Sequence, residues 1–211
     1  MDSTTAIVPV RRAALSFIFI TVLLDILAFG LVIPVLPHLI ASFLGGNLAN
    51  AAIVHGLFAS VFMVMQFIFS PVQGALSDRY GRRKVILLSN LGLGLDFILM
   101  AVAQTLPLLF IGRVLSGITS ASFSTANAYI ADVTPPEKRA AAFGKLGLAF
   151  GIGFVIAPAI GGLLGDMHPR LPFWIAAGLS LGNFCYGYFV LPESLPVERR
   201  APFSWRRANP I

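Results

Sequence analysis

Three ionisable side chains lie inside long apolar stretches of the sequence: Asp25, Asp96 and Arg113. A charged side chain at the centre of a membrane helix costs at least about 2.5 to 3.5 kcal/mol, so such residues are expected to be functional or paired. A carboxyl group at this depth can take up or release a proton when its hydration or its ligand changes. The long side chain of Arg113 can snorkel to the membrane surface or reach inward to Asp25. The three residues therefore predict a proton-exchanging site or, alternatively, a buried pair that only fixes helix packing.

Uncharged polar residues recur at helical spacing in two of the apolar stretches. Gln66 belongs to one such stripe, and Ser120, Ser124 and Asn127 continue the other stripe from Arg113. Spacings of three and four residues place these side chains on one face of a helix. A hydrated or ligand-lined cavity requires such a face, but close helix packing also produces one. The charge of Arg113 favours the cavity for the second stripe, and both interpretations stay open for the first.

The composition requires that these residues be held by membrane helices. Of the 211 residues, 57% are hydrophobic and only 11% are charged, whereas roughly a quarter of the residues of a soluble domain are charged. The mean hydropathy is +0.85. A spanning helix needs about 20 apolar residues. The sequence thus predicts an all-α integral membrane protein with six spans, at residues 14–37, 51–76, 85–105, 107–131, 140–164 and 172–191.

Several other classes of function are excluded. An intramembrane serine protease needs a histidine at membrane depth, but His38, His55 and His168 all fall near the ends of spans. The single cysteine, Cys185, excludes a cysteine zinc site within one chain. The net charge of +6 resides in short loops rather than on a soluble face, so we expect no nucleic-acid partner. We expect no enzyme activity, no protein metal site and no bound cofactor.

The basic residues fall at alternate ends of the spans, which sets the orientation. Basic residues lie in the tail before the first span and after the second, fourth and sixth spans. The opposite ends of the spans offer only Arg170. By the positive-inside rule the basic ends are cytoplasmic. We therefore expect a cytoplasmic tail at residues 1–13, a six-helix bundle at 14–191, and the start of a cytoplasmic loop at 192–211, in a cytoplasmic (inner) membrane.

Two segments with a similar residue order suggest an internal repeat. Residues 71–78 read PVQGALSD, and residues 158–166 read PAIGGLLGD, which is the same order with one residue inserted. The two segments end on opposite faces of the membrane. Two inverted three-helix repeats are the construction of many secondary transporters.

Several longer patterns resemble the major facilitator superfamily. The loop at residues 74–84, GALSDRYGRRK, is similar to the signature between helices two and three of that family. Asp25 followed by GLVIPVLP at 30–37 and GRVLSG at 112–117 match in order, and residues 153–162 resemble the motif of proton antiporters, with a departure at Ala157. The segments ANAYIADVT at 126–134 and LPES at 191–194 resemble the tetracycline/proton antiporters and their drug-efflux relatives. The resemblance runs over residues 14–211 and covers the N-terminal six-helix half of a twelve-helix family.

The resemblance implies proton-coupled drug efflux, in which two six-helix bundles rock about a midplane site. It implies that Asp25, Asp96 and Arg113 belong to the proton pathway, and that Gln66, Ser120, Ser124 and Asn127 are candidate substrate contacts. Its remaining site residues form a gating motif and an antiporter motif: Gly74, Asp78, Arg79, Gly81, Arg82, Arg83 and Asp132, and Gly153, Pro158, Gly161 and Gly162.

The resemblance also implies the partners. They are a small-molecule drug, protons, the lipid bilayer, and either a C-terminal six-helix half or a second copy of the chain. A divalent cation is expected to arrive with a tetracycline-like substrate. The alternatives are a truncated half that does not transport, and a homodimer that carries another small molecule.

Overall fold

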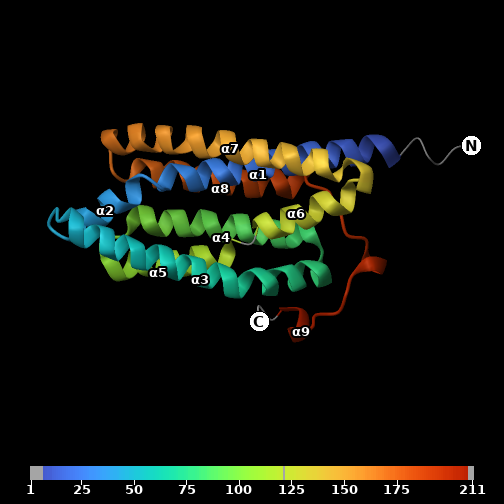
Figure 1. The fold of residues 1–211 in the computed structure, drawn as a ribbon, viewed down its shortest axis with the longest axis horizontal. Helices are drawn as coiled ribbons and strands as arrows, with labels where there is room; N and C mark the ends of the chain where they lie inside the picture. Colours follow the sequence, from blue (N-terminus) through green and yellow to red (C-terminus); the bar gives the residue numbers. More distant parts are fainter. Residues whose placement is uncertain (1–6, 121, 209–211) are drawn as a thin grey trace, which may run out of the picture.

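The computed structural model describes residues 7–120 and 122–208, with side chains described from residue 15 onward except at 122, 206 and 207. Residues 1–6 of the expected N-terminal tail therefore lie outside the described residues, and residues 7–13 form the first turns of a helix. Figure 1 shows long helices that run along one axis in alternating directions. The six predicted spans are confirmed as helical segments long and apolar enough to cross a membrane: Leu15–Phe43, Leu48–Tyr80, Arg82–Val102, Leu106–Val133, Pro136–Met167 and Leu171–Val190.

Two of the six spans are broken, although the sequence predicted continuous helices there. The first span consists of α1 (Ile7–Val32) and α2 (Val35–Phe43). Pro34 lies at this break, because proline removes a backbone hydrogen bond and clashes with the preceding turn. The fourth span consists of α5 (Leu106–Thr119) and α6 (Ser122–Val133).

The remaining spans are single helices. They are followed by two short helical turns after the last span. In chain order these elements are α3 (Leu48–Tyr80), α4 (Arg82–Val102), α7 (Pro136–Met167), α8 (Leu171–Val190), η1 (Val197–Arg199) and α9 (Trp205–Ala208). Two of the single helices, α3 and α7, extend beyond both expected ends, whereas α4 and α8 begin earlier and end one to three residues before the expected end.

The turn between α3 and α4 depends on a single glycine. Gly81 has φ of 102° and ψ of 149°, a backbone conformation that side chains with a Cβ rarely adopt. Its backbone N–H donates to Ser77 O at 3.1 Å, which closes α3. Because one residue makes the whole turn, the last turn of α3 and the first turn of α4 lie side by side.

Small residues allow α1 and α7 to pack closely. A Cβ added at Gly30 would lie 2.6 Å from the Ala157 Cβ. A Cβ added at Gly161 would lie 2.8 Å and 2.9 Å from the backbone C and Cα of Leu31. Close approach of this kind is how membrane helices gain van der Waals contact in the absence of a hydrophobic driving force.

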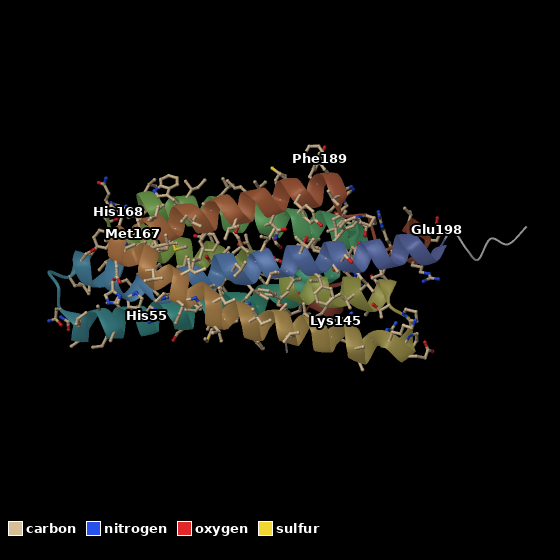
Figure 2. All side chains as sticks on the ribbon, turned by 90° about the horizontal axis from the view of Figure 1, so that it is seen from above. His55, Lys145, Met167, His168, Phe189 and Glu198 are labelled. Carbon is tan, nitrogen blue, oxygen red and sulfur yellow. The ribbon has the colours of Figure 1, made fainter. Side chains whose placement is uncertain are left out.

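The two ends of the bundle differ in charge. The α3–α4 turn, the α6–α7 junction and the end of α8 lie at the same end as the N-terminus (Figure 1). Figure 2 shows His55 and His168 at the opposite end from Glu198. This arrangement agrees with the expectation that the basic loops share one membrane face. We call the end that holds residues 78–84 the basic end.

Candidate functional site

A cavity opens among α1, α3, α4, α6 and α7 within the apolar part of the bundle. It has a volume of about 230 Å³. Three of the polar residues singled out from the sequence line it, namely Asp25, Gln66 and Ser120. Most of the remaining lining is phenylalanine, at positions 29, 62, 97, 123, 150 and 154.

Two buried amides hold the carboxylate of Asp25. Asn183 Nδ2, on α8, donates to Asp25 Oδ1 and to Thr21 O, both at 2.8 Å. The Asn90 amide, on α4, satisfies its neighbours when its nitrogen faces both Asp25 oxygens at 3.2 Å and its oxygen accepts from Asn183. Asn90 and Asn183 are fully buried, and Asp25 is 4% exposed. The amides thus orient a buried carboxylate at the wall of the cavity.

Sequence reasoning missed Asn90 and Asn183. The signal was present, because each is a lone amide in the middle of an apolar span. A polar group at membrane depth needs a hydrogen-bond partner, and each of the two could have been assigned as a partner for a buried carboxylate.

Arg113 lies beside Asp96, whereas the sequence analysis considered that it could reach Asp25. Arg113 Nη2 is 3.6 Å from Asp96 Oδ2, and the two side chains are 7% and 0% exposed. Ser116 Oγ donates to the same carboxylate oxygen, and Arg113 Nη2 lies 3.2 Å from Ser116 Oγ. The guanidinium also lies over the ring of Phe62, at 5.8 Å from its centroid. Asp96, Arg113 and Ser116 therefore form a buried polar cluster between α4 and α5, outside the cavity lining.

The polar stripe of the fourth span is divided between buried and exposed positions. Ser120 is buried and lines the cavity, whereas Ser124 and Asn127 are exposed and lie outside its lining. The stripe was predicted to line a cavity along its whole length, and of its residues beyond Gly117 only Ser120 does so among those that the structure describes.

Three residues of the expected gating motif meet at the basic end. Arg82 Nη2 lies 2.6 Å from Asp78 Oδ1, and Arg82 Nε lies 3.2 Å from Asp132 Oδ2. Arg82 also donates to Ser77 Oγ at 2.5 Å. We call Asp78, Arg82 and Asp132 the charged cluster; it joins α3, α4 and α6.

The other residues of the two motifs lie in different surroundings. Arg83 donates to the carbonyl of Tyr188, and the exposed Arg79 lies over the ring of Tyr80.

The glycines of the two motifs differ in the space around them. A Cβ added at Gly74 or Gly162 would meet no atom within 4 Å. Gly153 and Gly161 face α1, and Pro158 lies inside α7.

The segment after α8 packs against the charged cluster, which sequence reasoning did not anticipate. Glu193 Oε1 accepts from the backbone N–H of Arg82 at 2.9 Å, and Ser194 Oγ donates to Asp132 Oδ2 at 3.2 Å. Further along, the Ala201 N–H donates to Asp78 O at 3.1 Å. Each contact engages a residue of the charged cluster, two of them through its backbone and one through the Asp132 side chain.

The structure thus combines the carboxylate of Asp25, at a cavity inside the bundle, with the ion pairs of the charged cluster at the basic end. Such a cavity can bind a ligand and a proton, whereas partly exposed ion pairs can be broken and remade at modest cost.

Comparison with known proteins identifies the family. The profile of the Major Facilitator Superfamily matches residues 18–210. The class C tetracycline resistance protein of Escherichia coli is 43% identical over 198 residues, which are 94% of this chain and 49% of the relative. The human major facilitator superfamily domain-containing protein 10 is 32% identical, over 92% of this chain and 47% of the relative. The chain thus spans about half the length of the curated relatives it matches.

Solved structures show the same fold. The crystal structure of the human organic anion transporter MFSD10 superposes with a TM-score of 0.81 at 27% identity, covering 94% of this chain and 52% of that one. A peptide transporter structure superposes with a TM-score of 0.74 at 17% identity, over 89% of this chain and 40% of that one, which shows the fold alone. These findings establish a multi-pass membrane protein related to transporters and not to enzymes. The chain belongs to the major facilitator superfamily.

Proposed function

We propose that this chain is a six-helix half of a proton-coupled antiporter that exports tetracycline-like drugs. The observation that carries the proposal is the buried carboxylate of Asp25 at the wall of the cavity. A carboxylate there can bind a proton or a ligand, and competition between the two at one site couples their movements in opposite directions. The identity of 43% to a tetracycline resistance protein supports the choice of substrate.

The charged cluster acts in this proposal as a latch. Arg82 has two carboxylate partners, Asp78 and Asp132, whose side chains are 39% and 25% exposed. Pairs that are partly hydrated in this way exchange partners at low cost, so a rocking motion can break them. The latch closes the basic end when the cavity opens to the other side of the membrane.

The buried cluster of Asp96 and Arg113 serves the proton pathway or fixes the packing of α4 on α5. Its two charges are close enough to neutralise each other, and Ser116 donates a hydrogen bond to the Asp96 carboxylate. Breaking such a pair leaves an uncompensated buried charge.

The location and partners complete the proposal. The basic end faces the cytoplasm, and the protein lies in the inner membrane. The opposing bundle is a second six-helix half or a second copy of this chain. A divalent cation arrives with the drug, and the chain needs no metal or cofactor of its own.

The proposal is tested by uptake of labelled tetracycline into inverted membrane vesicles. The vesicles hold this chain alone or with the C-terminal half of the class C relative, with and without a proton gradient that is acid inside. Uptake that needs the gradient in either preparation, and that falls sharply with Asp78→Asn, supports the proposal. Absence of uptake in both preparations, with insertion of the chains verified, overturns it.

A further inference from the structure

The carboxylate of Asp25 lies between the cavity and a pair of buried amides. Asp25 belongs to the lining of the cavity, whereas Asn90 and Asn183 lie outside that lining. The three residues come from three different helices, α1, α4 and α8, and both amides are fully buried. A ligand in the cavity can therefore reach the carboxylate, while the amides contact it from within the packed helices.

The backbone of α1 fixes the direction of the Asn183 amide. Asn183 Nδ2 donates to Thr21 O and to Asp25 Oδ1, both at 2.8 Å. A backbone carbonyl can only accept a hydrogen bond, so turning the amide over would set its oxygen against two acceptors. The nitrogen of Asn183 is thus held toward Asp25 by a partner that does not titrate.

The Asn90 amide takes its direction from Asn183. Its oxygen accepts from Asn183 Nδ2 at 3.1 Å, and its nitrogen then lies 3.2 Å from both oxygens of Asp25. Asn183 Nδ2 has two hydrogens for three acceptors, so one of them is shared in a three-centre bond. Contacts therefore run from the Thr21 carbonyl through two amides to the carboxylate, and each amide presents N–H groups to Asp25.

Such donors favour the ionised form of Asp25. An ionised carboxylate only accepts hydrogen bonds, whereas a protonated carboxyl group carries an O–H that must donate. Hydrogen bonds to the charged form of an acid stabilise that form, and one bond to a charged group is worth roughly 10- to 150-fold in an equilibrium constant. Removal of one amide should shift the balance at Asp25 toward the protonated form.

Other titratable groups on the surrounding helices are engaged elsewhere, exposed or near helix ends. Tyr129 of α6 donates to the Pro192 carbonyl, and the Tyr186 ring of α8 packs on Phe17. The remaining titratable residues of α2, α6, α7 and α8 are exposed. Those of α3 and α4 lie within two turns of a helix end, and among them Asp96 is paired with Arg113 of α5. Among the described residues of the cavity lining, Asp25 alone is titratable.

We propose that Asn90 and Asn183 are positioning residues for proton exchange at Asp25, which hold the carboxylate in its ionised form and so allow the proton to leave after it has been taken up. The inference rests on the proposed function in taking Asp25 as the carboxylate that exchanges protons. Without the amides, Asp25 would stay protonated over a wider range of pH, and the exchange would stop at the proton-loaded form.

The test uses dicyclohexylcarbodiimide, which reacts with protonated carboxyl groups in apolar surroundings and leaves a stable N-acylurea. The purified full chain in detergent is treated for a fixed time at a series of pH values, and modified aspartates are located and quantified by mass spectrometry of peptides. We expect labelling of Asp25 to rise to a plateau as the pH falls. Comparison of variants at each pH cancels the pH dependence of the reagent itself.

Two variants remove the N–H donors and approximately keep the side-chain volume, namely Asn183→Leu and Asn90→Leu. Each should move the half-maximal labelling of Asp25 to higher pH by about one unit or more and leave the acid plateau unchanged. Ser180→Ala is the matched control, because Ser180 lies one turn from Asn183 on α8 and is fully buried, and its Oγ has no hydrogen-bond partner among the described residues. Its half-maximal pH should equal that of the unmodified chain.

A purely structural role of the amides predicts a different result. Loosened packing would raise the labelling of Asp25 and Asp96 together at every pH, with the half-maximal pH of Asp25 unchanged. That result, or equal half-maximal pH in the unmodified chain and both amide variants, overturns the proposal. If Asn183→Leu fails to fold, as judged by helix content, Asn90→Leu decides, because it leaves both 2.8 Å bonds between α8 and α1 in place.

The labelling is measured without drug and without a proton gradient. Tetracycline uptake can therefore fail while the shift in half-maximal pH holds, and the reverse, so the failure of this inference is distinguishable from the failure of the proposed function.

Discussion

Two adjacent glycines of α7 should respond in opposite ways to the same substitution. Gly161 and Gly162 both belong to the expected antiporter motif, and the sequence does not distinguish them. A Cβ at Gly161 would lie 2.8 Å from the backbone C of Leu31, whereas a Cβ at Gly162 would meet no atom within 4 Å. Only the first of these positions lies against α1.

The magnitude follows from two opposing effects. Replacing glycine by alanine within a helix stabilises it by roughly 0.5 to 1 kcal/mol, and both variants share this gain. Overpacking costs about 1 to 3 kcal/mol, and at Gly161 the obstacle is backbone, which cannot rotate away. Gly162→Ala should therefore unfold at the same or a slightly higher denaturant level than the unmodified chain, and Gly161→Ala should be less stable than Gly162→Ala by about 1 to 3 kcal/mol.

The assay is unfolding of the purified chain from mild detergent micelles by titration with sodium dodecyl sulfate, followed by far-ultraviolet circular dichroism. The difference between two variants at neighbouring positions cancels the general effect of alanine on the helix. Equal stability of the two variants would refute the close packing of α1 on α7.

Three further predictions concern the polar residues inside the bundle. Asp96→Asn should lower the free energy of unfolding by about 3 to 5 kcal/mol, because it leaves Arg113 buried without its counter-charge; the added change Arg113→Met should recover most of the loss in the same titration. Asn183→Leu removes two hydrogen bonds of 2.8 Å and should destabilise the chain by about 1 to 3 kcal/mol, and a midpoint equal to that of the unmodified chain would contradict this. Cysteine at Ser124 should react quickly with a water-soluble maleimide, whereas cysteine at Ser116, which is 2% exposed, should react slowly; similar rates would contradict the described burial.

The sequence was sufficient to predict the spans but not their breaks. Runs of apolar residues long enough to cross a bilayer leave few alternatives to a helix, and all six predicted spans are present. The break at Pro34 had a local signal, since proline interrupts helices, whereas the break near Ser120 had none. Ser124 and Asn127 are exposed, whereas Ser120 lines the cavity, and helical spacing alone does not predict which neighbours a face meets.

The pairing of buried charges depends on which helices are neighbours, and the sequence does not specify this. Arg113 had two acidic candidates at similar depth, Asp25 and Asp96, and the packing of α5 on α4 brings the second within 3.6 Å. The contacts of Glu193 with the charged cluster span 111 residues in sequence. By contrast, Asp78 and Arg82 are four residues apart, so the sequence alone placed them close together.

The central claim is that proton and drug exchange through the cavity that Asp25 lines. Its most direct test is proton movement in proteoliposomes that contain the chain and its opposing bundle, with an acidic lumen and a pH-sensitive dye inside. Adding tetracycline outside should raise the lumenal pH, because protons leave as the drug enters, and Asp25→Asn should abolish this response. Drug entry without a change in lumenal pH, or an equal response from Asp25→Asn, would contradict the account.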